Sequence, residues 1–115
     1  MDITEKTNEA TIKITGLLNL ALRAGNLVLG VDNIRRSRKV RAVIADAGLA
    51  DGSVQRLVRY AAERSMPLYL YAGELADLVY KQNCRAVGIS DGNIWKGMSA
   101  NILNLAEFKI FGSEK

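Results

Sequence analysis

Residues 40–46 read VRAVIAD and decide the fold. Five of these seven side chains are apolar, which is typical of a strand that lies inside a sheet and is covered on both faces. Turn-forming residues follow at 47–52, and Val54, Leu57 and Val58 then repeat at helical spacing. A strand that is apolar on both sides needs helices above and below it, so the sequence predicts an α/β sheet covered on both faces.

The alternation of strands and helices continues in both directions from this strand. We expect strands at 27–29, 40–46, 68–72 and 85–90. We expect helices at 9–24, 31–38 and 74–80, and a last helix from Asp91 or Asn93 to about Asn104. A further helix follows the strand at 40–46; we expect Ser53 to cap it and the helix to end before Pro67. In the tail, 105–115, we expect the first part to dock on the body and the last residues to fray. The predicted fold class is α/β, a three-layer α/β/α sandwich in one domain, residues 1–115.

Composition narrows the classes of function. The chain has 115 residues, with 16 Lys and Arg against 12 Asp and Glu, no histidine and one cysteine. The lack of histidine excludes Ser-His and Cys-His nucleophilic catalysis and every zinc site that needs imidazole. No GxGxxG or GxxxxGK(S/T) loop follows a strand, and Asp46 and Asp51 are interpreted as turn and capping residues rather than as metal ligands. We expect a binding protein without catalytic residues, metal or cofactor.

Neither a membrane span nor a secretory signal is expected. The longest stretch without charge is residues 97–106, whereas a spanning helix needs about 20 apolar residues. The first residues, MDITEK, lack the basic and apolar regions of a secretory signal. Cys84 is interpreted as a free core thiol, as suits a reducing compartment. We therefore expect a cytoplasmic protein with no membrane partner, and the sequence leaves its oligomeric state open.

Basic side chains are concentrated just before the central strand. Five of them fall within seven positions, namely Arg35, Arg36, Arg38, Lys39 and Arg41, while the whole chain has a net charge of only +4. Such a cluster attracts phosphate groups and releases counterions on binding. It is equally compatible with a solvated face that serves solubility. The cluster alone does not decide between these two interpretations.

Polar residues at the start of the second helix offer a second signal. Gly30 precedes this helix, and Asp32 and Asn33 fall in its first turn, one turn before Arg36. A carboxylate can accept from guanine N–H groups, and an amide can both donate and accept, so these side chains are candidates for reading base edges. The simpler alternative is that they cap the helix.

Residues 17–30, LLNLALRAGNLVLG, resemble the opening of the bacterial kink-turn RNA-binding proteins of the ribosomal protein L-seven-Ae/L-thirty-e superfamily, which reads roughly LLGLARRAGKLVSG. Residues 43–47, 66–69 and 85–91 resemble later strand segments of the same family in the same order. The resemblance covers residues 12 to about 104. It implies a four-stranded mixed sheet between helices, and RNA gripped by the first turn of the second helix and by a neighbouring loop.

The resemblance also assigns candidate RNA-binding residues. Archaeal and eukaryotic family members have Gly-x-Asn-Glu at the start of the second helix and a lysine three positions later; this chain has Gly30, then Asp32 and Asn33 in place of Asn-Glu, then Arg36. Between Arg36 and Val43 it is about one helical turn shorter than the family. The loop before the last strand is polar, which favours hydrogen bonds and phosphate contacts. The full candidate set is Gly30, Asp32, Asn33, Arg35, Arg36, Arg38, Lys39, Lys81, Gln82 and Asn83.

Three functions fit these observations. The first is non-catalytic binding of structured, kink-turn-like RNA, ribosomal or ribosome-associated, in a cytoplasmic ribonucleoprotein. The second is a protein-interaction or assembly module that keeps the fold but has lost the RNA site. The third is a recognition subunit beside an RNA-modifying partner. Preference for a kink-turn over a duplex of equal length distinguishes the first from the second.

Overall fold

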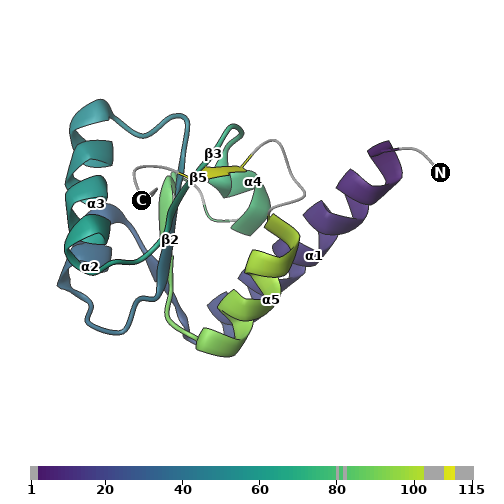
Figure 1. Cartoon of the computed structure of the whole chain (residues 1–115), viewed down its shortest axis with the longest axis horizontal. Helices are drawn as coiled ribbons and strands as arrows, with labels where there is room; N and C mark the ends of the chain where they lie inside the picture. The colour runs from purple at the N-terminus through teal and green to yellow at the C-terminus, as the bar shows by residue number, and fades with distance from the viewer. Residues whose placement is uncertain (1–2, 80, 82, 103–107, 111–115) are drawn as a thin grey trace.

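The computed structural model describes residues 3–79, 81, 83–102 and 108–110, and its helices and strands alternate along the chain (Figure 1). The helices are α1 (Ile3–Arg23), α2 (Val31–Arg36), α3 (Asp51–Glu63), α4 (Leu75–Val79) and α5 (Gly92–Ile102). The strands are β1 (Leu27–Leu29), β2 (Ala42–Asp46), β3 (Leu68–Tyr71), β4 (Ala86–Ile89) and β5 (Phe108–Ile110). None of the described helices is long and apolar enough to cross a membrane.

The strands form one mixed sheet in the order β1-β4-β2-β3-β5. β2 and β3 are parallel, and the other three neighbouring pairs are antiparallel. The four expected strands are therefore confirmed, with β2 in the interior. β5 adds a short edge strand beside β3 that the sequence pattern did not indicate, and through it the tail docks on the body. The expectation of fraying falls on residues 111–115, outside the described part.

Helices cover both faces of the sheet, as expected for an α/β/α sandwich (Figure 1). On one face α2 and α3 pack on Val43 and Ala45 through Ile34 and Leu57. On the other face α1, α4 and α5 pack on alternate strand residues such as Ile44. Because neighbouring residues of a strand point to opposite faces, β2 contributes to both cores, and all five of its residues are buried. This burial explains the nearly continuous apolar run that identified the strand.

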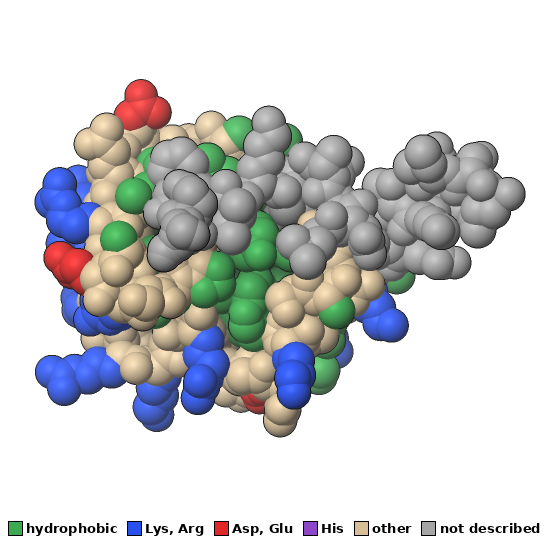
Figure 2. Space-filling view, viewed as in Figure 1, with side chains coloured by type: hydrophobic (Ala, Val, Ile, Leu, Met, Phe, Trp, Pro, Cys, Tyr) green, Lys and Arg blue, Asp and Glu red, His purple; other side chains and the backbone are tan. Residues whose placement is uncertain are grey.

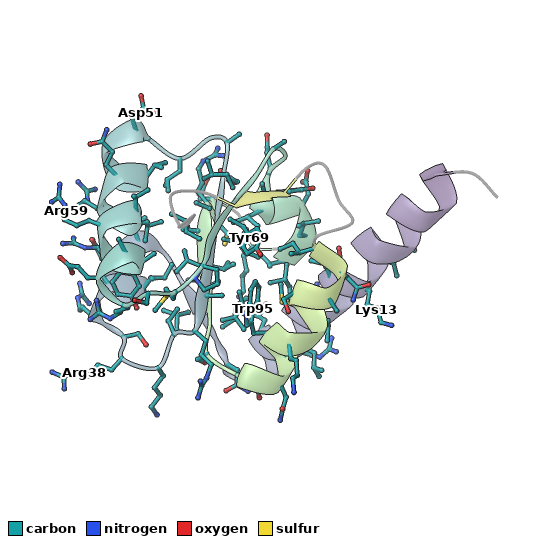
Figure 3. The ribbon with its side chains drawn as sticks, in the orientation of Figure 1. Lys13, Arg38, Asp51, Arg59, Tyr69 and Trp95 are labelled. Atoms are coloured by element: carbon teal, nitrogen blue, oxygen red, sulfur yellow. The ribbon has the colours of Figure 1, made fainter. Side chains whose placement is uncertain are left out.

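Two aromatic side chains pack in the core between the sheet and helices α1, α4 and α5. Tyr69 is buried, and its ring lies 5.7 Å from the half-buried Trp95 ring at a tilt of 54° (Figure 3). Burial raises the pKa of Tyr69 above its ordinary value.

Cys84 is a free, buried thiol, as expected, and burial is the main cause that raises its pKa. Its thiol therefore stays protonated at neutral pH and packs as an apolar group.

The structure shows which residues cap the two helices for which the sequence offered capping residues, α5 and α3. Asp91 caps α5, because its Oδ1 accepts from the backbone N–H groups of Asn93 (2.8 Å) and Ile94 (3.0 Å). The expectation that Ser53 caps α3 is wrong. That helix begins three residues earlier than expected, with Ala50 as N-cap, and the hydroxyl of Ser53 accepts instead from Arg56.

Candidate nucleic-acid interface

The start of α2 depends on the backbone of Gly30. Gly30 is the N-cap, with φ 92° and ψ 148°, a region essentially restricted to glycine. Its N–H donates to the carbonyl of Ala86 (3.0 Å), and its own carbonyl accepts from the N–H of Ile34 (3.0 Å). The residue thus ties the first turn of α2 to the beginning of β4. No side chain caps this helix, so Asp32 and Asn33 are not its N-cap residues.

Asp32 and Asn33 are both exposed in the first turn of α2. The amide nitrogen of Asn33 donates to the carbonyl of Leu29 (2.9 Å) and so braces the turn between β1 and α2. An asparagine amide has two N–H donors and one acceptor oxygen. The bond to Leu29 uses one donor, and the amide oxygen stays an acceptor that a base edge can meet.

The turn before β4 lies at the same end of the sheet. The N–H of Cys84 donates to the carbonyl of Lys81 (3.2 Å), which closes this turn, and Asn83 occupies the left-handed region with φ 63°. Asparagine tolerates that conformation better than most residues. Lys81 and Asn83 are exposed, while Gln82 lies outside the described residues. β1 ends where β4 begins in their antiparallel pairing, which places this turn beside the start of α2.

The basic run is divided between a helix and an extended segment. The expected helix 31–38 ends at Arg36, because Ser37 is extended (φ −82°, ψ 143°). Arg38 and Lys39 therefore lie beyond the helix, in the segment that leads to β2, and Arg38 points away from the body (Figure 3). The early end has a packing reason. Val40 and Ile34 are both buried, and the side chains of both lie close to Gly88 of β4.

The segment from Gly30 to Arg41 therefore runs from one end of β4 to the other. Gly30 bonds to Ala86 at one end, and the N–H of Arg41 donates to Ile89 at the other (2.7 Å). The three steps from Ala86 to Ile89 span about 10 Å at roughly 3.3 Å each. Between these ends Arg35 and Arg36 are exposed on α2, and Arg35 lines a hollow against α3. The candidate residues thus form a band along α2 rather than one compact cluster.

Asp46 stabilises the end of the sheet at which β4 begins, a role that the sequence did not reveal. Its side chain is fully buried. Oδ2 accepts from the N–H of Leu75 (2.9 Å), and Oδ1 accepts from the N–H of Gly48 (2.9 Å) and lies 3.4 Å from Nη1 of Arg85. One buried carboxylate therefore joins the turn after β2, the start of α4 and the residue before β4. Asp46 is a turn residue as expected, but its other partners come from distant segments.

Arg85 is a candidate contact residue outside the set expected from sequence. Its side chain is 42% exposed and is held between Asp46 and the backbone of Gly48, where an added Cβ would collide with the guanidinium. It directly precedes Ala86, the partner of Gly30. The arginine itself was visible in the sequence, but its pairing with Asp46 spans 39 positions. Among the residues that the structure describes, no group of three or more His, Cys, Asp or Glu could hold a metal ion.

No model of a known protein family matches this chain, and no curated protein does. Among solved structures, it is similar to a protein from Bacillus halodurans that is described as having unknown function. The TM-score is 0.71 and the sequence identity 19%, over 76% of this chain and 94% of the other. At this identity the likeness concerns the fold alone.

Proposed function

We propose that this chain binds structured RNA of the kink-turn type, without catalysis, through the start of α2 and the turn at residues 81–84. The observation that carries the proposal is the hydrogen bond from the N–H of Gly30 to Ala86 (3.0 Å), which joins the start of α2 to the first residue of β4, shortly after this turn. The start of α2 and this turn are the two segments that the family resemblance implies for RNA contact. Ribosomal or ribosome-associated RNA in the cytoplasm is the partner class that follows from that resemblance.

Each part of this surface has a separate role in the proposal. Exposed Asp32 and Asn33 face base edges, because a carboxylate and an amide can read hydrogen-bonding patterns. Lys81 and Arg85 meet the backbone of the strand that passes the turn. Phosphate contacts of this kind set position and orientation and carry no sequence information. RNA shape and charge therefore supply affinity, and the first turn of α2 supplies discrimination.

Replacing Asn33 with alanine tests the base-reading role. We expect the variant to lose about 1–3 kcal/mol of discrimination between a kink-turn with intact G·A pairs and one with those pairs replaced, a factor of roughly 5 to 150. Affinity for both RNAs is measured by fluorescence anisotropy, beside the thermal midpoint of the variant.

Asn101→Ala is a matched control for this substitution. The amide of Asn101 donates to the carbonyl four residues earlier, Gly97 (2.8 Å), just as Asn33 does to Leu29, but it lies on α5. The control should melt slightly earlier and discriminate as well as the parent. If Asn33→Ala behaves in the same way, Asn33 only braces the turn, and the chain reads shape and charge alone.

A second candidate function is a protein-interaction module. One observation favours it: Ile12 and Leu20 of α1 are 70% and 47% exposed. They lie two turns apart, on the same side of the helix. Isolated apolar side chains are common on protein surfaces, so this observation is weaker than the arrangement at the start of α2. A module of this kind would show no preference for a kink-turn.

A further inference from the structure

A hollow of about 280 Å³ lies between α2 and α3, away from the start of α2. Four arginines, one tyrosine and one glutamate line it: Arg35 from α2, and Arg56, Arg59, Tyr60, Glu63 and Arg64 from α3 and its C-cap. In Figure 2, Lys and Arg side chains gather along the α3 side and the lower rim of the molecule. The arginines of α3 lie outside the candidate set expected from sequence, and no local pattern connects them with Arg35.

Tyr60 forms a rigid wall of this hollow. It is 4% exposed, and its hydroxyl donates to the carbonyl of Ser37 (3.2 Å), which ties α3 to the end of α2. Burial raises the pKa of Tyr60, while the charge of Arg64 acts in the opposite direction. The hydroxyl therefore remains a protonated donor at neutral pH.

Two of the four arginines are held in place by neighbours. The guanidinium carbon of Arg64 lies 4.3 Å from the centre of the Tyr60 ring, and Nη2 of Arg56 donates to the hydroxyl of Ser53 (3.0 Å). A guanidinium that stacks on a ring keeps its N–H edges available for another partner. Side chains that are already positioned lose less conformational freedom when a ligand binds.

The charge of the hollow is not balanced from within. Four arginines face one glutamate, and among the residues that the structure describes none of these four guanidinium groups has a carboxylate oxygen within 4.0 Å. Arg59 points away from the sheet on the outer side of α3 (Figure 3). Like charges gathered in this way repel one another, and a phosphate relieves the repulsion through paired, charge-assisted hydrogen bonds.

The lining favours the backbone of a polymer over a small organic ligand. Sites for small organic ligands are mostly apolar, whereas this hollow is lined mainly by charged groups. α2 is six residues and therefore about 9 Å long, and it joins the hollow to Asp32 and Asn33. A nucleic-acid strand that runs along α2 would reach both places.

We propose that the hollow between α2 and α3 binds phosphate groups of the RNA backbone and extends the RNA contact beyond the start of α2. This inference rests on the proposed RNA-binding function. The arginines of α3 add affinity and salt dependence there, and leave discrimination between RNAs to Asp32 and Asn33.

The test is the salt dependence of kink-turn binding for the double variant Arg59→Gln/Arg64→Gln, which leaves Tyr60 intact. We expect the slope of log affinity against log salt to become shallower by about 0.7–0.9 for each lost phosphate contact, with discrimination between intact and replaced G·A pairs unchanged. The matched control is Arg23→Gln/Lys96→Gln. It removes the same charge from exposed residues of α1 and α5, on the other side of the sheet. Thermal midpoints confirm that both variants are folded.

A slope equal to that of the control would overturn the proposal. A further arm adds inorganic phosphate or pyrophosphate at constant ionic strength. If either ion raises the thermal midpoint of the wild-type protein but not that of the hollow variant, while the salt slope is unchanged, the hollow is a site for free phosphate and the RNA proposal is wrong. Failure of the proposed RNA-binding function gives a different result. The wild-type protein would then bind a kink-turn and a duplex equally, whatever salt slopes the variants show.

Discussion

Replacing Asp46 with alanine is expected to lower the free energy of unfolding by about 3 kcal/mol, which is a large share of the 5–15 kcal/mol typical of a domain. The carboxylate is fully buried and accepts from the backbone N–H groups of Leu75 and Gly48 (2.9 Å each). The N–H of Leu75 is buried, and a buried donor left without an acceptor costs about 1–3 kcal/mol, whereas Gly48 is exposed and its N–H adds less. Arg85 adds little to the sum, because its own side chain is 42% exposed. The thermal midpoint should fall by roughly 10 °C.

Two further variants separate this explanation from a general effect of charge. Asp46→Asn keeps the shape of the side chain and one acceptor oxygen, so it should lose about half as much stability. Asp77→Ala removes an exposed carboxylate from α4, and it should cost less than about 1 kcal/mol. Equal losses for Asp46→Ala and Asp77→Ala in denaturant unfolding would show that Asp46 does not join these segments.

Substituting Gly30 with alanine should destabilise the chain by about 1–3 kcal/mol. The reason is its backbone conformation, φ 92° and ψ 148°, and not lack of space, because the nearest atom to an added Cβ would be the amide nitrogen of Asn33 at 4.0 Å. The variant can relax only by moving the first turn of α2. Kink-turn affinity, measured where the variant is still folded, should therefore fall as well.

Gly16→Ala is the matched control for this substitution, and it should have the opposite sign. Gly16 lies within α1, is exposed and has nothing within 4 Å of an added Cβ. Alanine in such a helical position should stabilise the chain by about 0.5–1 kcal/mol. Circular dichroism melts of the two variants measure both effects. A Gly30→Ala protein as stable as the parent would contradict the described turn.

Local sequence patterns were sufficient for the elements that bury apolar side chains. The strand at 40–46 and the helix after it were recognisable because apolar spacing within a few residues determines them. α1 begins at Ile3, well before the expected start at residue 9, because its first residues carry no apolar stripe. β5 has only three residues, Phe108–Ile110, too few for a periodic signal.

Contacts between distant segments account for what the sequence did not reveal. α2 ends at Arg36 because Ile34 and Val40 must both reach the core, and this packing depends on Gly88 in another strand. The partners of Asp46 lie 29 and 39 positions away. The hollow combines Arg35 with the outer face of α3, and no local pattern indicates which helix faces which. The first-turn residues Asp32 and Asn33 stay candidates: their place after Gly30 and one turn before Arg36 marked them first, and the family resemblance marked them again.

The most direct test of RNA recognition is the affinity of the wild-type protein for a generic kink-turn and for a duplex of equal length, measured at the same salt concentration. Both RNAs carry similar charge, so non-specific attraction to phosphate contributes to both complexes. We expect the kink-turn to bind at least about tenfold more tightly, which corresponds to about 1.4 kcal/mol. Equal affinity for the two RNAs would contradict RNA recognition at the start of α2.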